Sequence, residues 1–252
     1  MLASAPLTSL AVIIPTLDEE DALQRHLAAT AAEADRVVVS DGGSRDASVE
    51  VARRAGAAVV TGPAGRGGQL NRGAAAAGDS DVLLFLHADT RLPAGAGGRV
   101  RRAVEAGAAG GGFSARFDDG GAWMRLGSRL VELRTRLTRL PLGDQAQFVR
   151  RDAFAALGGF RDWPILEDLD FMRRLKAHAR RRGGLALLRP PVVTSARRYR
   201  EDGIARTVAR NWWIWTLYLL GASPHRLARL YPPRSPSADQ TKAVQQKAAQ
   251  KK

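Results

Sequence analysis

The sequence has no cysteine and little lysine, and it has no hydrophobic run long enough to cross a bilayer. The absence of cysteine excludes disulfide bonds, thiolate metal sites and a cysteine nucleophile, and it is neutral about the compartment. The longest apolar stretch, Trp212 to Ala222, is about half of the ~20 residues that a transmembrane helix needs. No secretory signal is predicted either, because the first apolar run stops at Pro15 and is followed by acids.

Lysine is scarce because nearly all of the basic residues are arginines. Apart from Lys176, every lysine lies beyond Tyr231, so the C-terminal segment differs in composition from the rest of the chain. We predict that residues 232–252 form a flexible tail outside the core. The formal net charge of +14 suits nucleic acid, an anionic membrane surface or anionic small substrates.

The 252 residues, of which 45% are hydrophobic, suffice for one large α/β domain or two small ones. Strands are predicted at 10–14, 37–39, 57–60 and 81–86, and helical patterns separate them. Strands connected in this way form right-handed crossovers, which predict a mostly parallel sheet. Further strands are predicted at 113–117, 147–149, 185–188 and 192–194. Further helices are predicted at 69–77, 123–140, 152–158, 167–178 and 204–220.

The central predicted strand is an uninterrupted apolar run that ends in His87-Ala88-Asp89. Such a run is typical of a strand buried on both faces of a parallel sheet. The carboxylate after it lies in the crevice at the C-terminal edge, where open α/β folds bind ligands. Asp89 is therefore a candidate for the metal and phosphate end of a nucleotide site, although an aspartate also suits a helix N-cap.

Acids also follow the earlier strands, with Asp18 and Glu19 after the first and Asp41 after the second. Clustered carboxylates repel a diphosphate unless a divalent cation lies between them or they read the base. We therefore expect Mg²⁺ or Mn²⁺ at Asp89 and a base contact at Asp41, with helix capping as the alternative for each acid. The glycine-rich loop 62–68 lacks the Walker A and dinucleotide patterns, so side chains at strand ends must bind the nucleotide.

Four segments, in order and sensibly spaced, resemble the family 2 glycosyltransferases of GT-A fold. They are residues 10–20 (LAVIIPTLDEE), 37–48 (VVVSDGGSRDAS), 69–90 (QLNRGAAAAGDSDVLLFLHADT) and 158–175 (GGFRDWPILEDLDFMRRL). The resemblance covers about residues 8–200 and implies an open, mostly parallel sheet with helices on both faces. The expected organisation is a domain at 1–200, with a nucleotide-binding half at 8–105 and a catalytic half at 106–200, and a helical extension at 201–231.

The resemblance also implies roles for individual residues. Asp89 matches the last acid of the Asp-x-Asp metal motif, and Asp168 matches the catalytic base of inverting members, with Glu167 helping to bind the acceptor. The residues assigned to nucleotide binding are Pro15, Thr16, Glu19, Asp41, Arg66, Asn71 and His87. The residues assigned to an acceptor or donor-sugar loop are Gly143, Asp144, Gln145 and Trp163.

One departure from the family pattern is His87, which replaces the first acid of Asp-x-Asp. A histidine can still hydrogen-bond the ribose there, but the metal then has fewer carboxylates; the alternative is a half-buried histidine with a local partner. A narrower resemblance exists to a bacterial subgroup with this His-Ala-Asp, a Gly-Arg-x-x-Gln-x-Asn loop and a tryptophan-rich C-terminal helix.

These residues suggest transfer of a hexose from a nucleotide-diphosphate sugar, preferably a UDP-sugar, to an acceptor hydroxyl. A metal and an arginine stabilise the leaving phosphate; the candidate arginines are Arg66, Arg197 and Arg198, each of which could instead be a solvated surface residue. A carboxylate partly desolvated at a helix start has a raised pKa, which suits Asp168 as the base, unless Glu167 and Asp168 simply cap their helix. Inversion is expected because a base is available and no separate nucleophile is evident.

Two other classes of protein remain as alternatives. A nucleotidyltransferase would carry a basic glycine-rich loop after the first strand, where this chain is acidic. A basic nucleic-acid-binding protein would explain the charge, but no recognised motif is present, and we expect no specific nucleic-acid partner.

The helix predicted at 204–220 carries the apolar stretch Trp212–Leu220. It either packs on the core or contacts a membrane peripherally, since tryptophans suit the headgroup zone and nearby arginines suit anionic lipid. The second interpretation fits a lipid-linked or apolar acceptor and a cytoplasmic protein on the inner leaflet. A second arginine-rich amphipathic helix is expected at 123–140, with Leu126, Leu130, Leu133 and Leu137 at helical spacing.

Overall fold

The structure is a computed structural model, and it describes residues 8–119, 121–180 and 182–231. The first half contains β1 (Leu10–Thr16), α1 (Glu20–Ala31), β2 (Arg36–Asp41), α2 (Ser48–Arg54), β3 (Ala58–Thr61), α3 (Arg66–Ala75), β4 (Val82–Phe85), β5 (Thr90–Arg91) and α4 (Ala96–Glu105). The second half contains β6 (Gly110–Phe117), α5 (Ala122–Thr138), the 3₁₀ turn η1 (Gly143–Gln145), β7 (Gln147–Arg150), α6 (Arg151–Ala156), α7 (Glu167–Ala179), β8 (Leu185–Thr194), α8 (Arg197–Asp202), α9 (Ile204–Leu219), α10 (Pro224–Leu227) and η2 (Ala228–Leu230). The predicted tail lies outside the described residues.

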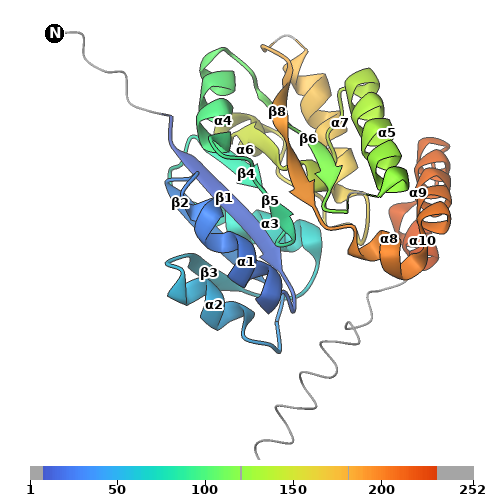
Figure 1. The fold of residues 1–252 in the computed structure, drawn as a ribbon. Coiled ribbons are helices and arrows are strands. Elements are labelled where there is room, and N and C mark those ends of the chain that lie inside the picture. Colours follow the sequence, from blue (N-terminus) through green and yellow to red (C-terminus); the bar gives the residue numbers. More distant parts are fainter. Residues whose placement is uncertain (1–7, 120, 181, 232–252) are drawn as a thin grey trace, which may run out of the picture.

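The strands form one sheet of eight in the order β3-β2-β1-β4-β7-β6-β8-β5 (Figure 1). The four strands at the β3 end are parallel, as the crossovers predict. β7 pairs antiparallel with both β4 and β6, and β5 pairs antiparallel with β8. The mixed α/β class with a mostly parallel sheet is therefore confirmed.

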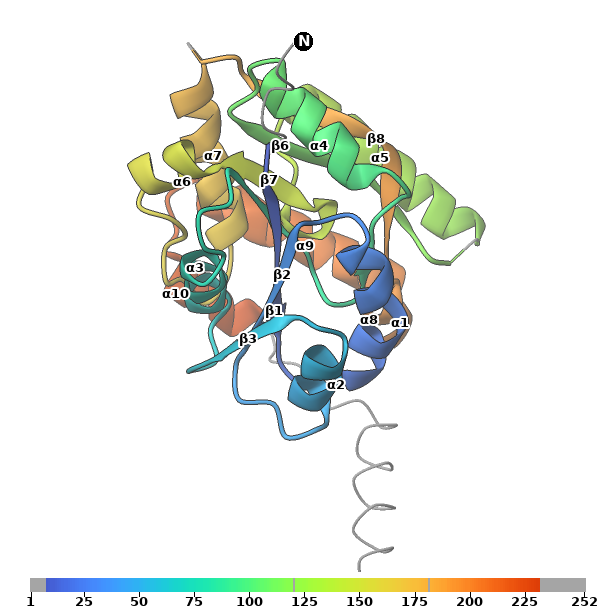
Figure 2. The same cartoon turned by 90° about the vertical axis from the view of Figure 1, so that its left-hand side faces the viewer.

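Helices cover both faces of the sheet (Figure 2). On one face, apolar residues of α1, α2 and α4 pack against alternate β1 residues such as Val12 and Ile14. On the other face, α3, α6 and α7 pack against Ala11 and Ile13. This alternation along a wholly buried strand explains why β1 has no polar face.

The second half differs from the prediction where glycines lie in regular elements. β6 begins at Gly110, because the neighbouring strands approach so closely that only glycine fits: an added Cβ at Gly111 would lie 2.0 Å from the carbonyl oxygen of Ala186. α4 was not predicted, and its first turn contains two glycines, of which Gly97 packs against the Glu33 backbone. The two strands expected at 185–194 are one strand, β8.

Helix α3 begins at Arg66, three residues before the predicted start, and packs closely on the sheet. An added Cβ at Gly73 would lie 2.3 Å from Cγ2 of Ile13, whereas one at Gly68 would meet the ends of two side chains, Arg72 at 3.4 Å and Asp162 at 3.8 Å. We expect Gly73→Ala to lower the free energy of unfolding by about 1–3 kcal/mol through overpacking. Gly68→Ala is the matched control, and it should raise this free energy by up to about 1 kcal/mol through helix propensity. Urea unfolding of both variants measures this, and equal destabilisation would contradict the packing.

The C-terminal helices follow β8 and pack beside α5 and α7 (Figure 1). Arg134 of α5 lies over the ring of Trp215 in α9, 5.9 Å from its centroid. Tyr218 of α9 lies against Trp163, with ring centroids 6.2 Å apart. Among the described residues, no helix is both long and apolar enough to span a membrane.

Candidate active site

The C-terminal ends of β1 and β2 are joined by a buried glutamine of α3. The Gln69 Nε2 donates hydrogen bonds to the carbonyl oxygens of Thr16, at 2.8 Å, and Ser40, at 2.9 Å. Thr16 also accepts the Gly42 N–H at 2.8 Å. Gln69 therefore fixes the loops of the crevice where Pro15 and Thr16 lie. Gln69 was not among the predicted site residues, although its place in the Gly-Arg-x-x-Gln-x-Asn loop was a signal.

Asp41 ends β2 and organises the loop that follows. Its Oδ2 accepts the backbone N–H groups of Gly43, at 2.8 Å, and Ser44, at 3.0 Å, and its Oδ1 accepts the Ser44 hydroxyl. The side chain is almost fully buried. This carboxylate holds its own loop, so its predicted contact with the base requires it to share or exchange these partners.

Glu19 joins the start of the chain to its C-terminal region. Its Oε1 lies 3.2 Å from Nη2 of Arg197 at the start of α8. The side chain of Glu19, at the N-cap position of α1, makes no capping hydrogen bond, so the capping alternative for Glu19 does not hold. One predicted nucleotide residue and one predicted phosphate residue are thus neighbours. Arg198 lies in α8, but its side chain falls outside the described part of the chain.

Three predicted residues converge at Gly143, a fourth predicted position. A Cβ added to Gly143 would lie 2.5 Å from Nη2 of Arg66, 2.9 Å from Oδ2 of Asp168 and 3.0 Å from Nε2 of His87. These side chains come from the first turn of α3, the first turn of α7 and the segment after β4. Together with Pro15 they line a small cavity. Residues as far apart in the chain as Pro15 and Asp168 therefore line one charged site at the sheet edge.

Asp168 bridges the helix on which it lies and the η1 loop. Its Oδ2 accepts the Gly143 N–H at 2.6 Å, and its Oδ1 accepts the N–H of Leu169 at 2.7 Å. The side chain is half-buried, lies in the first turn of α7 and faces the cavity. A carboxylate held at both oxygens has a fixed orientation, which a general base requires.

Glu167 is buried beside Arg66, with Oε1 3.2 Å from the arginine Nε. Burial raises the pKa of Glu167 from 4.5 to about 7, Arg66 opposes the rise, and Asp168 adds to it. Desolvation at this helix start therefore acts on Glu167. The Arg66 guanidinium places a positive charge beside the cavity.

The raised pKa of Glu167 predicts a pH-dependent stability. The folded protein binds more protons than the unfolded chain between the ordinary pKa of 4.5 and the folded value of about 7, so the free energy of unfolding falls as pH rises through that window. Between about pH 5 and pH 8 this carboxyl should contribute a loss of about 2 kcal/mol. Glu167→Gln should remove that contribution. Urea unfolding at both pH values tests it, and an unchanged pH dependence in Glu167→Gln would contradict it.

The η1 loop is held in place by hydrogen bonds to α5. Oε1 of Gln145 accepts hydrogen bonds from Nη2 of Arg134, at 2.7 Å, and from the Thr135 hydroxyl, at 3.1 Å, while its Nε2 donates to the Phe113 carbonyl oxygen at 2.9 Å. Gln145 is fully buried, and these hydrogen bonds hold the η1 loop to α5 and β6. Burial raises the pKa of Asp144, and Arg134 opposes this rise.

Two other predicted residues lie away from the point of convergence. Asn71 donates to the Phe160 carbonyl oxygen at 2.8 Å and accepts the Phe160 N–H at 2.9 Å. Its amide therefore fastens α3 to the loop before α7. Trp163 is half-buried, with the Arg161 guanidinium 5.0 Å from its ring centroid. It connects that loop to α9 through Tyr218.

Asp89 lies in the turn between β4 and β5 and is half-buried. The described residues contain no group of three or more His, Asp or Glu side chains that could hold a metal ion. A hard carboxylate from Asp89, with the imidazole of His87 two residues before it, fits a divalent cation only if substrate oxygens complete the coordination. A diphosphate supplies such oxygens.

The fold occurs in known structures of glucosyl-3-phosphoglycerate synthase from Mycobacterium tuberculosis. Its complex with phosphoglyceric acid superposes with a TM-score of 0.52 at 21% identity over 75% of this chain and 70% of that chain. Its complex with Mn²⁺, UDP-glucose and phosphoglyceric acid gives 0.51 at 22% over 71% and 69%. The complex with Mg²⁺ and UDP gives 0.51 at 20% over 75% and 70%. At these identities the likeness shows the fold.

The family is given by the sequence match. No curated protein matches the chain. The family model described as Glycosyl transferase family 2 matches residues 11–158, which is more than half of the 252 residues. This range includes the ends of β1, β2 and β4 together with Arg66, His87 and the η1 loop. The chain therefore belongs to glycosyl transferase family 2.

Proposed function

We propose that the protein transfers a hexose from a nucleotide-diphosphate sugar to an acceptor hydroxyl with inversion at the anomeric carbon. The observation that supports this most strongly is the convergence of Arg66, His87 and Asp168 on Gly143 at the C-terminal edge of the sheet. It brings a cation, an imidazole and an oriented carboxylate to the lining of one cavity. This combination suits a reaction in which a negatively charged nucleoside diphosphate departs from one side of the sugar. On the other side, a base removes the proton of the acceptor hydroxyl.

The donor is a UDP-sugar in this proposal. Pro15, Thr16, Glu19 and Asp41 surround the ends of β1 and β2, where the base and ribose bind in open α/β folds. The similar mycobacterial enzyme has been crystallised with UDP-glucose and Mn²⁺, which supports this choice. Asp89, with His87, would hold the divalent cation, which supplies charge stabilisation for the leaving diphosphate.

Three residues of this chain have separate roles in the proposed reaction. The Arg66 guanidinium lies near enough to the cavity to stabilise a phosphate oxygen, and Glu167 fixes its position. Asp168 accepts the proton of the acceptor hydroxyl. Glu167 is buried against Arg66, whereas Asp168 lines the cavity, and a single positioned base suits direct, inverting displacement.

The acceptor binds on the α7–α9 side of the cavity in this proposal. The loop before α7 presents Trp163, Ile165 and Leu166, all half-buried. The ring of Trp163 contacts the ring of Tyr218 in α9. Partly exposed apolar side chains beside the base suit an apolar or lipid-linked acceptor. This differs from phosphoglyceric acid and glycerol 3-phosphate, the small molecules crystallised with the mycobacterial enzyme.

The proposal is tested by a thermal-shift panel of UDP-, GDP- and dTDP-sugars with and without Mn²⁺. A ligand at about 100 times its Kd adds about 2.7 kcal/mol of stability, which raises the Tm of a protein of this size by about 5–10 °C. We expect a UDP-sugar to give this shift only with the metal. A flat response to every nucleotide would contradict the proposed donor class.

A further inference from the structure

The outer face of α5 carries an apolar stripe that faces solvent. Its members have 45% to 76% of their surface exposed, and they are Trp123, Leu126, Leu130, Leu133 and Leu137. The opposite face of α5 is the buried one and includes Met124 and Thr135. The regular spacing of three and four residues predicts a single stripe along a helix. The sequence shows the spacing, and the structure shows that the stripe is turned away from the core.

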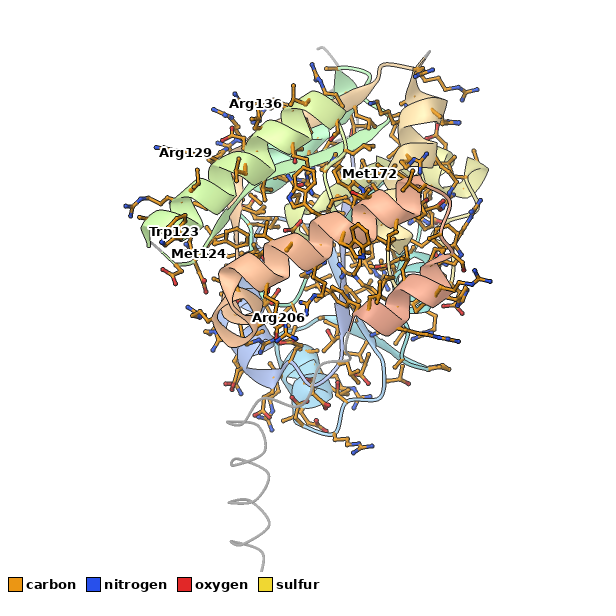
Figure 3. The ribbon with its side chains drawn as sticks, turned by 90° about the vertical axis from the view of Figure 1, so that its right-hand side faces the viewer. Trp123, Met124, Arg129, Arg136, Met172 and Arg206 are labelled. Carbon is orange, nitrogen blue, oxygen red and sulfur yellow. The ribbon has the colours of Figure 1, made fainter. Side chains whose placement is uncertain are left out.

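Helix α9 extends this apolar surface. It lies beside α5 on the same face of the molecule (Figure 3), and the contact between Arg134 and the Trp215 ring joins the two helices. The exposed large apolar residues of α9 and its C-cap have 56% to 79% of their surface exposed, and they are Trp212, Trp213, Leu219 and the C-cap Leu220. We call the exposed apolar residues of α5 and α9 the two-helix face. Large exposed apolar side chains gathered on one face of the described part of the protein mark an interaction site.

Arginines border the two-helix face. In Figure 3, Arg129 and Arg136 project from the side of α5 turned away from α9, and Arg206 lies at the start of α9. The single acid of α5, Glu132, is engaged by Arg136, at 2.9 Å, and by Arg189. α9 carries no acid at all. The border of the face is therefore strongly positive.

This charge pattern selects among possible occupants. In a symmetric pair of copies, the same arginines would meet across the interface and repel each other. The C-terminal segment 232–252 is unsuitable, because it carries four lysines and Arg234 and has no leucine, isoleucine or aromatic residue. An anionic bilayer complements both features, since its acyl region accepts leucine and tryptophan and its headgroups attract arginine.

We propose that the two-helix face is a docking surface for an anionic lipid bilayer, with α5 and α9 lying in the plane of the interface. Neither helix spans the bilayer. The inner face of α5 holds Gln145 through Arg134 and Thr135, and the neighbouring Gly143 donates to Asp168. Docking therefore brings the catalytic cavity close to the membrane surface. The inference concerns the location of the protein and stands independently of which sugar it transfers.

The test is flotation of the full-length protein with vesicles of phosphatidylcholine, alone or with about 30% phosphatidylglycerol. We expect binding only to the anionic vesicles. Leu130→Glu combined with Leu133→Glu should weaken binding by about 100-fold or more. Arg129→Gln combined with Arg136→Gln should weaken it by roughly 25-fold.

The matched control is Arg53→Gln with Arg54→Gln, which removes two exposed charges from α2 at the far end of the molecule (Figure 1). These substitutions should change vesicle binding far less than those on α5. Absence of vesicle binding, or equal binding by the leucine variant, would overturn the proposal. So would light scattering that shows a dimer which the leucine variant converts to a monomer, because the face would then bind a second copy. Unchanged melting temperatures of all variants exclude misfolding, since the substituted side chains are exposed.

Discussion

Replacing Asp168 with asparagine should reduce kcat by about 10³-fold, because general base catalysis contributes about 10²–10⁴ to a rate. Asparagine retains the shape of the side chain, and its carbonyl oxygen can still accept the Gly143 N–H that Asp168 accepts at 2.6 Å. The loop and the cavity should therefore persist. Steady-state kinetics with the donor and a competent acceptor measure the effect.

Nucleotide binding separates the loss of a base from a loss of structure. The Asp168→Asn variant should keep the thermal shift that a UDP-sugar and Mn²⁺ produce, since the assigned nucleotide residues lie on other strand ends. The matched control is Asp152→Asn, which changes an exposed acid in the first turn of α6 and should leave kcat unchanged. Full turnover by Asp168→Asn would show that another group accepts the proton.

Replacing Asp89 with asparagine should abolish the metal-dependent part of the nucleotide response. A neutral amide is a poor ligand for Mg²⁺ or Mn²⁺ compared with a carboxylate, and with His87 in place of the first acid this site has no second carboxylate nearby in the motif. We expect kcat/KM to fall by about 10²–10³-fold, which corresponds to several kcal/mol of lost charge stabilisation. Chelation of the metal in the unaltered protein should reproduce this loss.

An exposed acid near the same strand provides the control for this variant. Asp79→Asn removes one negative charge from the turn before β4 and should leave both the metal-dependent shift and kcat/KM intact. An Asp89→Asn protein that still binds UDP in a metal-dependent manner would contradict the assignment of Asp89. Another carboxylate, such as Asp18 or Glu19, would then be the ligand to examine.

The first half of the fold was predictable because each element has a local signature. β1, β2 and β4 are buried on both faces and therefore read as apolar runs, and each is followed by a polar side chain at the sheet edge. Family membership also removes the nucleotidyltransferase and nucleic-acid-binding alternatives. The assignment of Asp41, Asp89 and Asp168 to three specific roles remains a prediction.

The second half was less predictable because its determinants are contacts between distant segments. Gly110 and Gly111 lie in a strand only because Phe148 and Ala186 approach them closely. The partnership of Glu19 with Arg197 spans 178 residues, and neither residue indicates the other in the sequence. The leucines of α5 have the spacing of a core-facing stripe, and only the position of α5 at the edge of the molecule shows that they face outward.

The central claim is that side chains from separate strand ends bind one nucleotide sugar with its anomeric carbon toward Asp168. A crystal structure of the protein with UDP and Mn²⁺, with the metal located by its anomalous signal, tests this most directly. The account predicts the metal bound by Asp89, uracil beside Asp41 and the β-phosphate near Arg66. A nucleotide bound elsewhere, with Asp41 and Asp89 both outside its contacts, would contradict it.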